Sequence, residues 1–459
     1  MKSTVLDPEK DTSPLSGSKK CADIPMTENP VNSTGLSLRR SFSWSLVGNI
    51  VYAGCQWGML VVLTKLTSPE MVGRFALGLA VTGPIIMLSQ FQLRGIQATD
   101  TIGEYEFGHY LGLRLSTTAL ALLIITGVVI VGNYSLETAL VIIAVGLSKA
   151  FESISDVYYG LMQRHERMDR ITRSRILKGL HSLVVMGSMV FLTGEVLWGV
   201  VGLAAVWGLF LFTYDLKNAA MTLKESNTAP NKEMSRHNPM LPIFEMNSLL
   251  CLSRLALPLG IVMALLSLNA NIPRYFIESY WGESELGIFA ALAYLVITGN
   301  VIVSAMGQSV TPRLAQHYAS GEINKYQQLL LRMIGIGVFL GAGGMLAALV
   351  AGQPVLAFLY SAEYADRAPV FIWLMLAGGL SYVASFLGYG LTAARYFKRQ
   401  VPIIIAATGG IYVASLAFIP NRGIAGAAYT LSIGSGIVLV LYAFVIKYAI
   451  NQKQMVRIN

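Results

Sequence analysis

The residues of this chain best able to do chemistry lie on one apolar stretch, K-A-F-E-S-I-S-D-V-Y-Y-G, at positions 149–160. Lys149, Glu152 and Asp156 follow one another there at spacings of three and four residues. On an α-helix this spacing places all three charges on one face. If the helix crosses a membrane, such groups are costly and face a bundle interior or a watery cavity. The stretch therefore predicts either an internal cluster of ion pairs that serves assembly or the charged lining of a transport cavity.

The composition indicates that this helix does cross a membrane. Of the 459 residues, 54% are hydrophobic and 13% are charged, whereas soluble domains have about 25% charged residues. The 44 glycines are typical of membrane helices, where small residues allow close approach. A soluble chain of this composition would need very large cores with hardly any polar surface. The net charge of +9 fits the positive-inside pattern of a polytopic protein, so we expect no nucleic-acid partner.

A series of apolar segments predicts an all-α polytopic membrane protein with about 12 transmembrane helices, since one crossing needs about 20 residues. The predicted spans are 42–63, 71–92, 108–132, 136–162, 173–193, 196–216, 247–271, 285–308, 327–351, 369–393, 401–419 and 424–446. Lys and Arg are about five-fold more frequent in alternate connections than in the others, which predicts that both termini are cytoplasmic.

The spans are expected to form two pseudo-symmetric six-helix lobes around a central cavity. A Glu followed by Gly-x-Phe-Ala opens both the second and the eighth span, which favours a parallel repeat with a site between the halves. The predicted units are a disordered cytoplasmic tail, a first lobe, a cytoplasmic linker, a second lobe and a cytoplasmic tail, at 1–40, 41–220, 221–246, 247–450 and 451–459. The segment 354–369 is expected to lie on the membrane surface, with Tyr360 and Tyr364 at the headgroups.

Arg254, inside the seventh span, is the candidate partner of Lys149 from the second lobe. The two cations would face one anionic substrate, while Glu152 and Asp156 would tune them or accept a coupling proton or sodium ion. A second interpretation of Arg254 stays open, because a cation near the end of a span can extend its charge to the headgroups. Polar residues within spans are secondary cavity candidates, although each alone is typical of an interhelical hydrogen bond. These candidates are Asn49, Gln56, Asn247 and Gln308.

Enzyme motifs are absent from the sequence. It contains no zinc helix, no dinucleotide loop and no P-loop, so we expect no catalytic residue, no metal ligand and no cofactor beyond a coupling ion. The basic stretch 164–178 is interpreted as a solvated cytoplasmic loop. It could also attract lipid headgroups or a pyrophosphate at the cytoplasmic entrance.

The fourth span also carries a resemblance to a known family. K-x-x-E-x-x-x-D-x-Y-Y-G-x-x-Q at 149–163, followed by R-M-D-R at 167–170, resembles the fourth-helix signature of Wzx-type O-antigen and polysaccharide flippases. These flippases form the polysaccharide branch of the multidrug/oligosaccharidyl-lipid/polysaccharide exporter superfamily. The resemblance covers roughly residues 40–450. Further similar stretches lie at 66–76, 271–275, 285–290 and 312–315.

The resemblance implies transport of undecaprenyl-pyrophosphate-linked oligosaccharides between the leaflets of a bacterial inner membrane, by alternating access and with ion coupling. It implies that Lys149 and Arg254 meet the pyrophosphate, with Glu152 and Asp156 beside them. Expected partners are the lipid-linked substrate, membrane lipids, glycosyltransferases and a polysaccharide polymerase. Two alternatives stay open. A multidrug or toxin cation antiporter of the same superfamily would favour an acidic cavity, and a membrane glycosyltransferase or ligase would need a large external loop.

Overall fold

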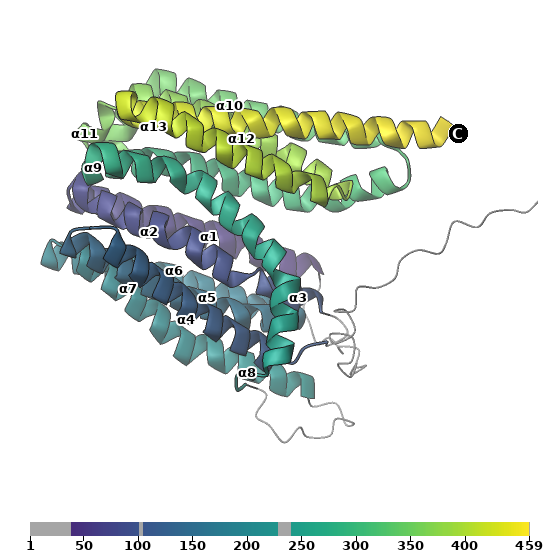
Figure 1. Ribbon diagram of the computed structural model, residues 1–459, viewed down its shortest axis with the longest axis horizontal. Coiled ribbons are helices and arrows are strands. Elements are labelled where there is room, and N and C mark those ends of the chain that lie inside the picture. The colour runs from purple at the N-terminus through teal and green to yellow at the C-terminus, as the bar shows by residue number, and fades with distance from the viewer. Residues whose placement is uncertain (1–37, 101–103, 228–239, 459) are drawn as a thin grey trace, which may run out of the picture.

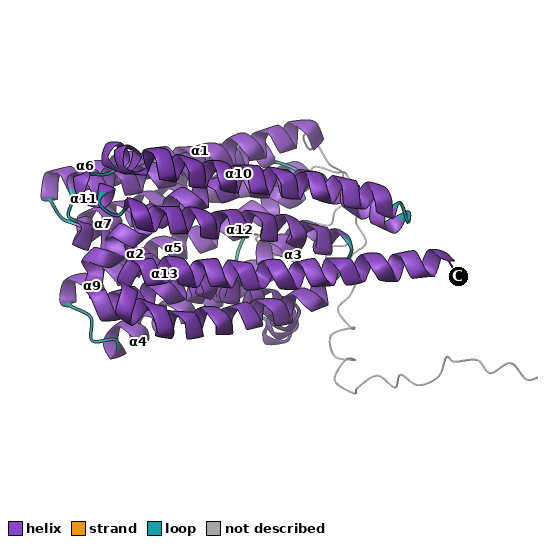
Figure 2. Cartoon of the chain, turned by 90° about the horizontal axis from the view of Figure 1, so that it is seen from above, coloured by secondary structure: helices purple, strands orange, loops and turns teal. Residues whose placement is uncertain are grey.

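The computed structural model describes residues 38–100, 104–227 and 240–458, and these residues form helices joined by short loops (Figures 1 and 2). The first half contains α1 (Leu38–Leu66), α2 (Pro69–Gln90), α3 (Leu93–Thr99), α4 (Phe107–Val131), α5 (Leu136–Arg164), α6 (Met168–Thr193), α7 (Val196–Phe210), the π-helix η1 (Leu211–Asp215) and α8 (Leu216–Asn227). The second half contains α9 (Met246–Ala319), α10 (Ile323–Leu359), α11 (Ala362–Ala365), α12 (Ala368–Ala393) and α13 (Phe397–Ile458). Residues 1–37 of the predicted N-terminal tail and the middle of the predicted linker lie outside the described residues, whereas residues 38–40 already belong to α1.

Ten helical segments of the described chain are long and apolar enough to cross a membrane. The 74-residue α9 is too long for one crossing, because it would extend about 110 Å against a hydrocarbon core of about 30 Å. It breaks at Gly282 (φ 83°, ψ −178°), and α13 breaks at Gly423 (φ 55°, ψ −134°). Glycine adopts these backbone angles without a steric penalty. Each break yields two crossings, so these ten segments supply the twelve spans that the sequence predicts.

The helices gather in two halves that α9 connects. In Figure 1, α1 to α8 lie in one half and α10 to α13 in the other, while α9 runs from the side of α8 across to the second half. The segment just before α9 is docked on α4, where the Ile243 amide donates to the Gly108 carbonyl at 2.9 Å. This arrangement accords with two lobes. The exact domain boundaries stay a prediction.

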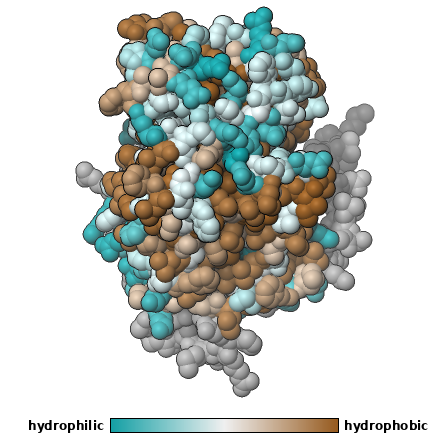
Figure 3. Space-filling model, turned by 90° about the vertical axis from the view of Figure 1, so that its left-hand side faces the viewer, coloured by the Kyte–Doolittle hydropathy of each residue, from teal (hydrophilic) through white to brown (hydrophobic). Residues whose placement is uncertain are grey.

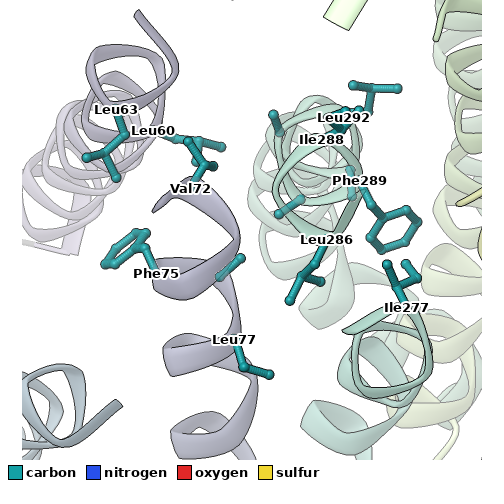
Figure 4. Close-up of a cluster of buried hydrophobic side chains, with 14 of the residues drawn as sticks. Leu60, Leu63, Val72, Phe75, Leu77, Ile277, Leu286, Ile288, Phe289 and Leu292 are labelled. Carbon is teal, nitrogen blue, oxygen red and sulfur yellow. The ribbon is translucent and has the colours of Figure 1, made fainter. Parts of the chain in front are cut away.

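One end of the molecule is sealed where α2 meets α9. Buried side chains of α1 and α2, including Leu63 and Val72, share a hydrophobic cluster with Leu286 and Phe289 of α9 (Figure 4). Figure 3 looks onto this end, where teal hydrophilic residues and white residues of intermediate hydropathy lie among brown hydrophobic ones. Because the cluster includes residues from both halves, packing holds them together here.

The backbones of α2 and α9 touch at this sealed end. A Cβ atom on Gly73 would lie 1.8 Å from the Glu283 carbonyl oxygen, and one on Gly287 would lie 1.9 Å from the Pro69 carbonyl oxygen. Arg74 adds an ion pair with Glu283 at 2.9 Å. We call this contact, formed by Gly73, Arg74, Glu283 and Gly287, the α2–α9 seam. Only glycine permits such close approach of two helices.

The structure corrects the prediction of a surface helix near residue 360. Helix α10 continues through Pro354 to Leu359, and the side chains of Tyr360 and Tyr364 are only 0% and 1% exposed. The Tyr360 hydroxyl donates to the Ala291 carbonyl at 2.9 Å. These tyrosines therefore belong to the core beside α9 and not to the headgroup layer.

Candidate functional site

A cavity of about 650 Å³ lies between the two halves, within the usual range of ligand pockets, roughly 300–1,000 Å³. Helices α1, α2, α5, α6 and α7 line it from the first half, and α9 lines it from the second. Its wall is apolar over most of its area and carries a group of polar side chains. These include Tyr52, Gln56, Gln90, Lys149, Glu152, Asp156, Tyr159, Arg175, Asn271, Arg274 and Tyr294.

Lys149 and Glu152 form an ion pair in the wall of this cavity. The Lys149 Nζ lies 2.7 Å from the Glu152 Oε2, and each side chain is 30% exposed. The Tyr52 hydroxyl donates to Glu152 at 3.4 Å and accepts a hydrogen bond from Gln56 at 2.7 Å. The predicted residues Lys149, Glu152 and Gln56 thus come together, and the pair remains open to a substrate.

Asp156 also reaches the cavity, but its partners lie behind the wall. Its carboxylate accepts a hydrogen bond from Arg94 of α3 at 3.3 Å and lies 3.7 Å from Arg114 of α4. Arg114 is 0% exposed; it pairs with Asp156 by charge alone, and it donates a hydrogen bond to the Ser153 hydroxyl at 3.1 Å. Asp156 is therefore the centre of a partly buried triad with Arg94 and Arg114. Asp156 thus forms ion pairs with two neighbouring helices, and ion pairs that serve assembly are one of the two alternatives that the sequence left open.

The cavity cation from the second half is Arg274, not Arg254. Arg254 is exposed and is not among the residues that line the cavity. The two positions are about 30 Å apart along an α-helix, so both side chains cannot reach one site. Arg274 donates to the Asn271 side chain at 3.0 Å and has no acidic partner within the described residues. The structure does not bring Arg254 and Lys149 together.

The basic stretch 164–178 is largely helical, not a solvated loop. Helix α6 begins at Met168, and Arg175 lines the cavity and donates to the Asn49 side chain at 2.8 Å. Lys178 is completely buried. The spacing of three between these two cations is the signal that could have placed them on one helix face.

The secondary candidates divide between two cavities and the surface. Asn49 and Gln308 line a second, mainly apolar cavity of about 640 Å³ between α1 and α9. Asn247 is exposed and lines neither of these two cavities. Only Gln56 of the four secondary candidates lies in the cavity that holds the charged residues.

Comparison with known proteins identifies the family. Residues 38–318 match the family described as polysaccharide biosynthesis protein. The chain belongs to this family. It is 26% identical over 424 residues to the capsular polysaccharide biosynthesis protein CapF of Staphylococcus aureus, and the match covers 89% of the chain and 99% of CapF. The Wzx-like resemblance carried by the fourth span is thereby confirmed.

Solved structures confirm the fold. An inward-facing multidrug resistance MATE family transporter of the MOP superfamily superimposes with a TM-score of 0.63 at 15% identity, over 92% of the chain and 97% of the transporter. The lipid II flippase MurJ, in an inward closed conformation, superimposes with a TM-score of 0.66 at 12% identity, over 90% of each chain. This polysaccharide biosynthesis family member is thus a multi-pass membrane protein that shares its fold with these solved transporters.

Proposed function

We propose that this family member flips a lipid-linked oligosaccharide, carried on undecaprenyl pyrophosphate, across the cytoplasmic membrane of a bacterium by alternating access. The observation that carries the proposal is that Arg175 and Arg274 face one cavity from opposite halves. Neither has an acidic partner in the described part of the chain. Both cations are therefore available to a pyrophosphate. The flipped product would serve the synthesis of O-antigen or another surface polysaccharide.

The charge of the cavity favours an anionic substrate over a cationic drug. Its described lining carries three cations, Lys149, Arg175 and Arg274, against the carboxylates of Glu152 and Asp156. Arg94 and Arg114 already neutralise Asp156 from behind. A cation antiporter would favour the opposite balance. A bare charge in hydrocarbon costs several kcal/mol, and guanidinium groups replace the lost hydration of a phosphate.

The lipid chain needs a route as well as the headgroup. The second cavity, between α1 and α9, is lined mainly by apolar residues such as Leu46, Ile50 and Val301. A prenyl chain there would stay in an apolar environment while the sugars occupy the polar cavity. The names of two relatives agree with this substrate class, since CapF is described by capsular polysaccharide biosynthesis and MurJ as a lipid II flippase.

The proposed orientation has both termini in the cytoplasm of the bacterium, as the distribution of Lys and Arg predicts. The α2–α9 seam then closes the periplasmic end, and the molecule is in a state that faces the cytoplasm. Membrane glycosyltransferases would supply the substrate on that side, and a polysaccharide polymerase would take the product on the other. A proton or sodium gradient would drive the cycle.

Arg274→Ala is expected to lower flipping about tenfold or more, because a hydrogen bond to a charged group contributes about 1.5–3 kcal/mol. The matched control is Arg254→Ala on the same helix, which is expected to keep wild-type activity because Arg254 lies outside the cavity. The measurement is the surface polysaccharide, and the unflipped lipid-linked precursor, in cells with each chromosomal variant at equal protein levels. Arg274→Lys should recover part of the loss. Equal defects in Arg274→Ala and Arg254→Ala would contradict the assignment.

A further inference from the structure

A fully buried lysine lies in the first half of the molecule, behind the wall of the cavity. Lys178 of α6 and Asp215 of η1 are each 0% exposed. The Lys178 Nζ lies 2.5 Å from an Asp215 carboxylate oxygen, 2.7 Å from the Ser155 hydroxyl and 3.1 Å from the Tyr159 hydroxyl. A lysine ammonium has three N–H donors, so each donor here has an oxygen acceptor.

The rest of this environment is also suited to a single positive charge. The Nζ lies 4.8 Å from the ring centroid of Trp207 and 5.3 Å from that of Tyr159, distances at which aromatic faces attract cations. The second carboxylate oxygen of Asp215 accepts a hydrogen bond from Ser174 at 2.5 Å. Asp215 is presented by the π-helix η1, an irregularity often found at functional sites.

We propose that this shell of Ser155, Tyr159, Trp207 and Asp215 is a monovalent-cation site whose permanent occupant is the ammonium of Lys178. One carboxylate, two hydroxyl groups and an aromatic face would offer a free monovalent cation the same ligands that they offer the ammonium. Stability alone does not explain the pair, because replacing a buried ion pair with apolar residues is often neutral or stabilising. The geometry is that of a filled binding site.

The tethered occupant limits which ion this site can exchange. A covalently attached ammonium cannot leave, so sodium or potassium has no place here, and a proton is the ion that can still be gained or lost. The charged groups around Lys178 are Asp215, Glu152 and Arg175, together with the Tyr159 hydroxyl. If the proposed flipping is ion-coupled, a consequence that rests on the proposed function, coupling at this site uses a proton and not sodium.

The test is to empty the site with Lys178→Ala in the full-length protein, purified in detergent. Melting temperatures are measured in NaCl, KCl, methylammonium chloride and choline chloride at equal ionic strength. The wild-type protein is expected to melt at one temperature in all four salts. Lys178→Ala is expected to melt lower in choline, and to gain about 5 °C or more in at least one salt of a small cation, because that cation binds the folded state.

The double variant Lys178→Ala/Asp215→Asn is the matched control, since it lacks the carboxylate and is expected to show no response to any cation. A Lys178→Ala protein that melts at the same temperature in all four salts would overturn the proposal. Should Lys178→Ala not accumulate, the wild type and Asp215→Asn decide. Equal melting of the wild type in all salts supports the proposal, and a sodium-dependent rise that Asp215→Asn abolishes overturns it. No lipid-linked substrate is used, so failure here leaves the flipping proposal intact.

Discussion

Asp156→Asn is expected to deplete the folded protein, with a loss of about 3–5 kcal/mol in the free energy of unfolding, because breaking a buried ion pair leaves a charge without compensation. Arg114 is completely buried, and its Nε and Nη2 have no hydrogen-bond partner among the described residues. The Asp156 carboxylate at 3.7 Å supplies the compensating charge, and asparagine would not. The measurements are the amount of protein in the membrane and its melting temperature in detergent.

Glu152→Gln is the matched control for Asp156→Asn. Glu152 lies about one turn before Asp156 on α5, so both substitutions neutralise a carboxylate on the same helix face. Its partner Lys149 is 30% exposed and can be hydrated in the cavity, so the expected loss of stability is below about 1 kcal/mol. Equal losses of stability in the two variants would mean that the triad of Asp156, Arg94 and Arg114 is not what holds these helices together.

The face shared by Lys149, Glu152 and Asp156 could be predicted because helical periodicity is a local property of the sequence. All three residues do line one cavity. Their partners could not be predicted in the same way. Arg114 lies in a strongly apolar span, and it meets Asp156 only because α4 packs beside α5. Pairing between helices depends on packing, which hydrophobicity does not encode.

The number of spans followed from hydrophobicity, but the positions of several cations did not. The apolar run of the seventh span ends near residue 271, so Arg274 was expected in an external connection. The helix instead continues through Pro273 to the break at Gly282. Its polar residues Asn271 and Arg274 are tolerated there because they line the cavity and do not face lipid. Lys178 was misplaced for a related reason: the positive-inside rule counts basic residues and says nothing of their burial.

Gly73→Ala is expected to abolish transport while leaving the protein folded in the membrane. The added Cβ would lie 1.8 Å from the Glu283 carbonyl oxygen, an atom of the backbone that cannot rotate away as a side chain would. The α2–α9 seam could then close only if the two helices moved apart, which would also stretch the Arg74 to Glu283 ion pair. Since alternating access needs both states, a variant that cannot close this end should stay open there.

The state of the seam can be measured with a single cysteine at Ser267, a cavity residue, in a background without other cysteines. A membrane-impermeant maleimide, added from the side of the seam, is expected to label this cysteine faster in Gly73→Ala than in the wild type. Gly287→Ala should act likewise, because its Cβ would meet the Pro69 carbonyl oxygen at 1.9 Å. Gly127→Ala is the control, since its Cβ would have no described atom within 4 Å. Wild-type transport and labelling in Gly73→Ala would mean that the added Cβ does not hold the α2–α9 seam open, and would contradict the assignment of this contact as the gate.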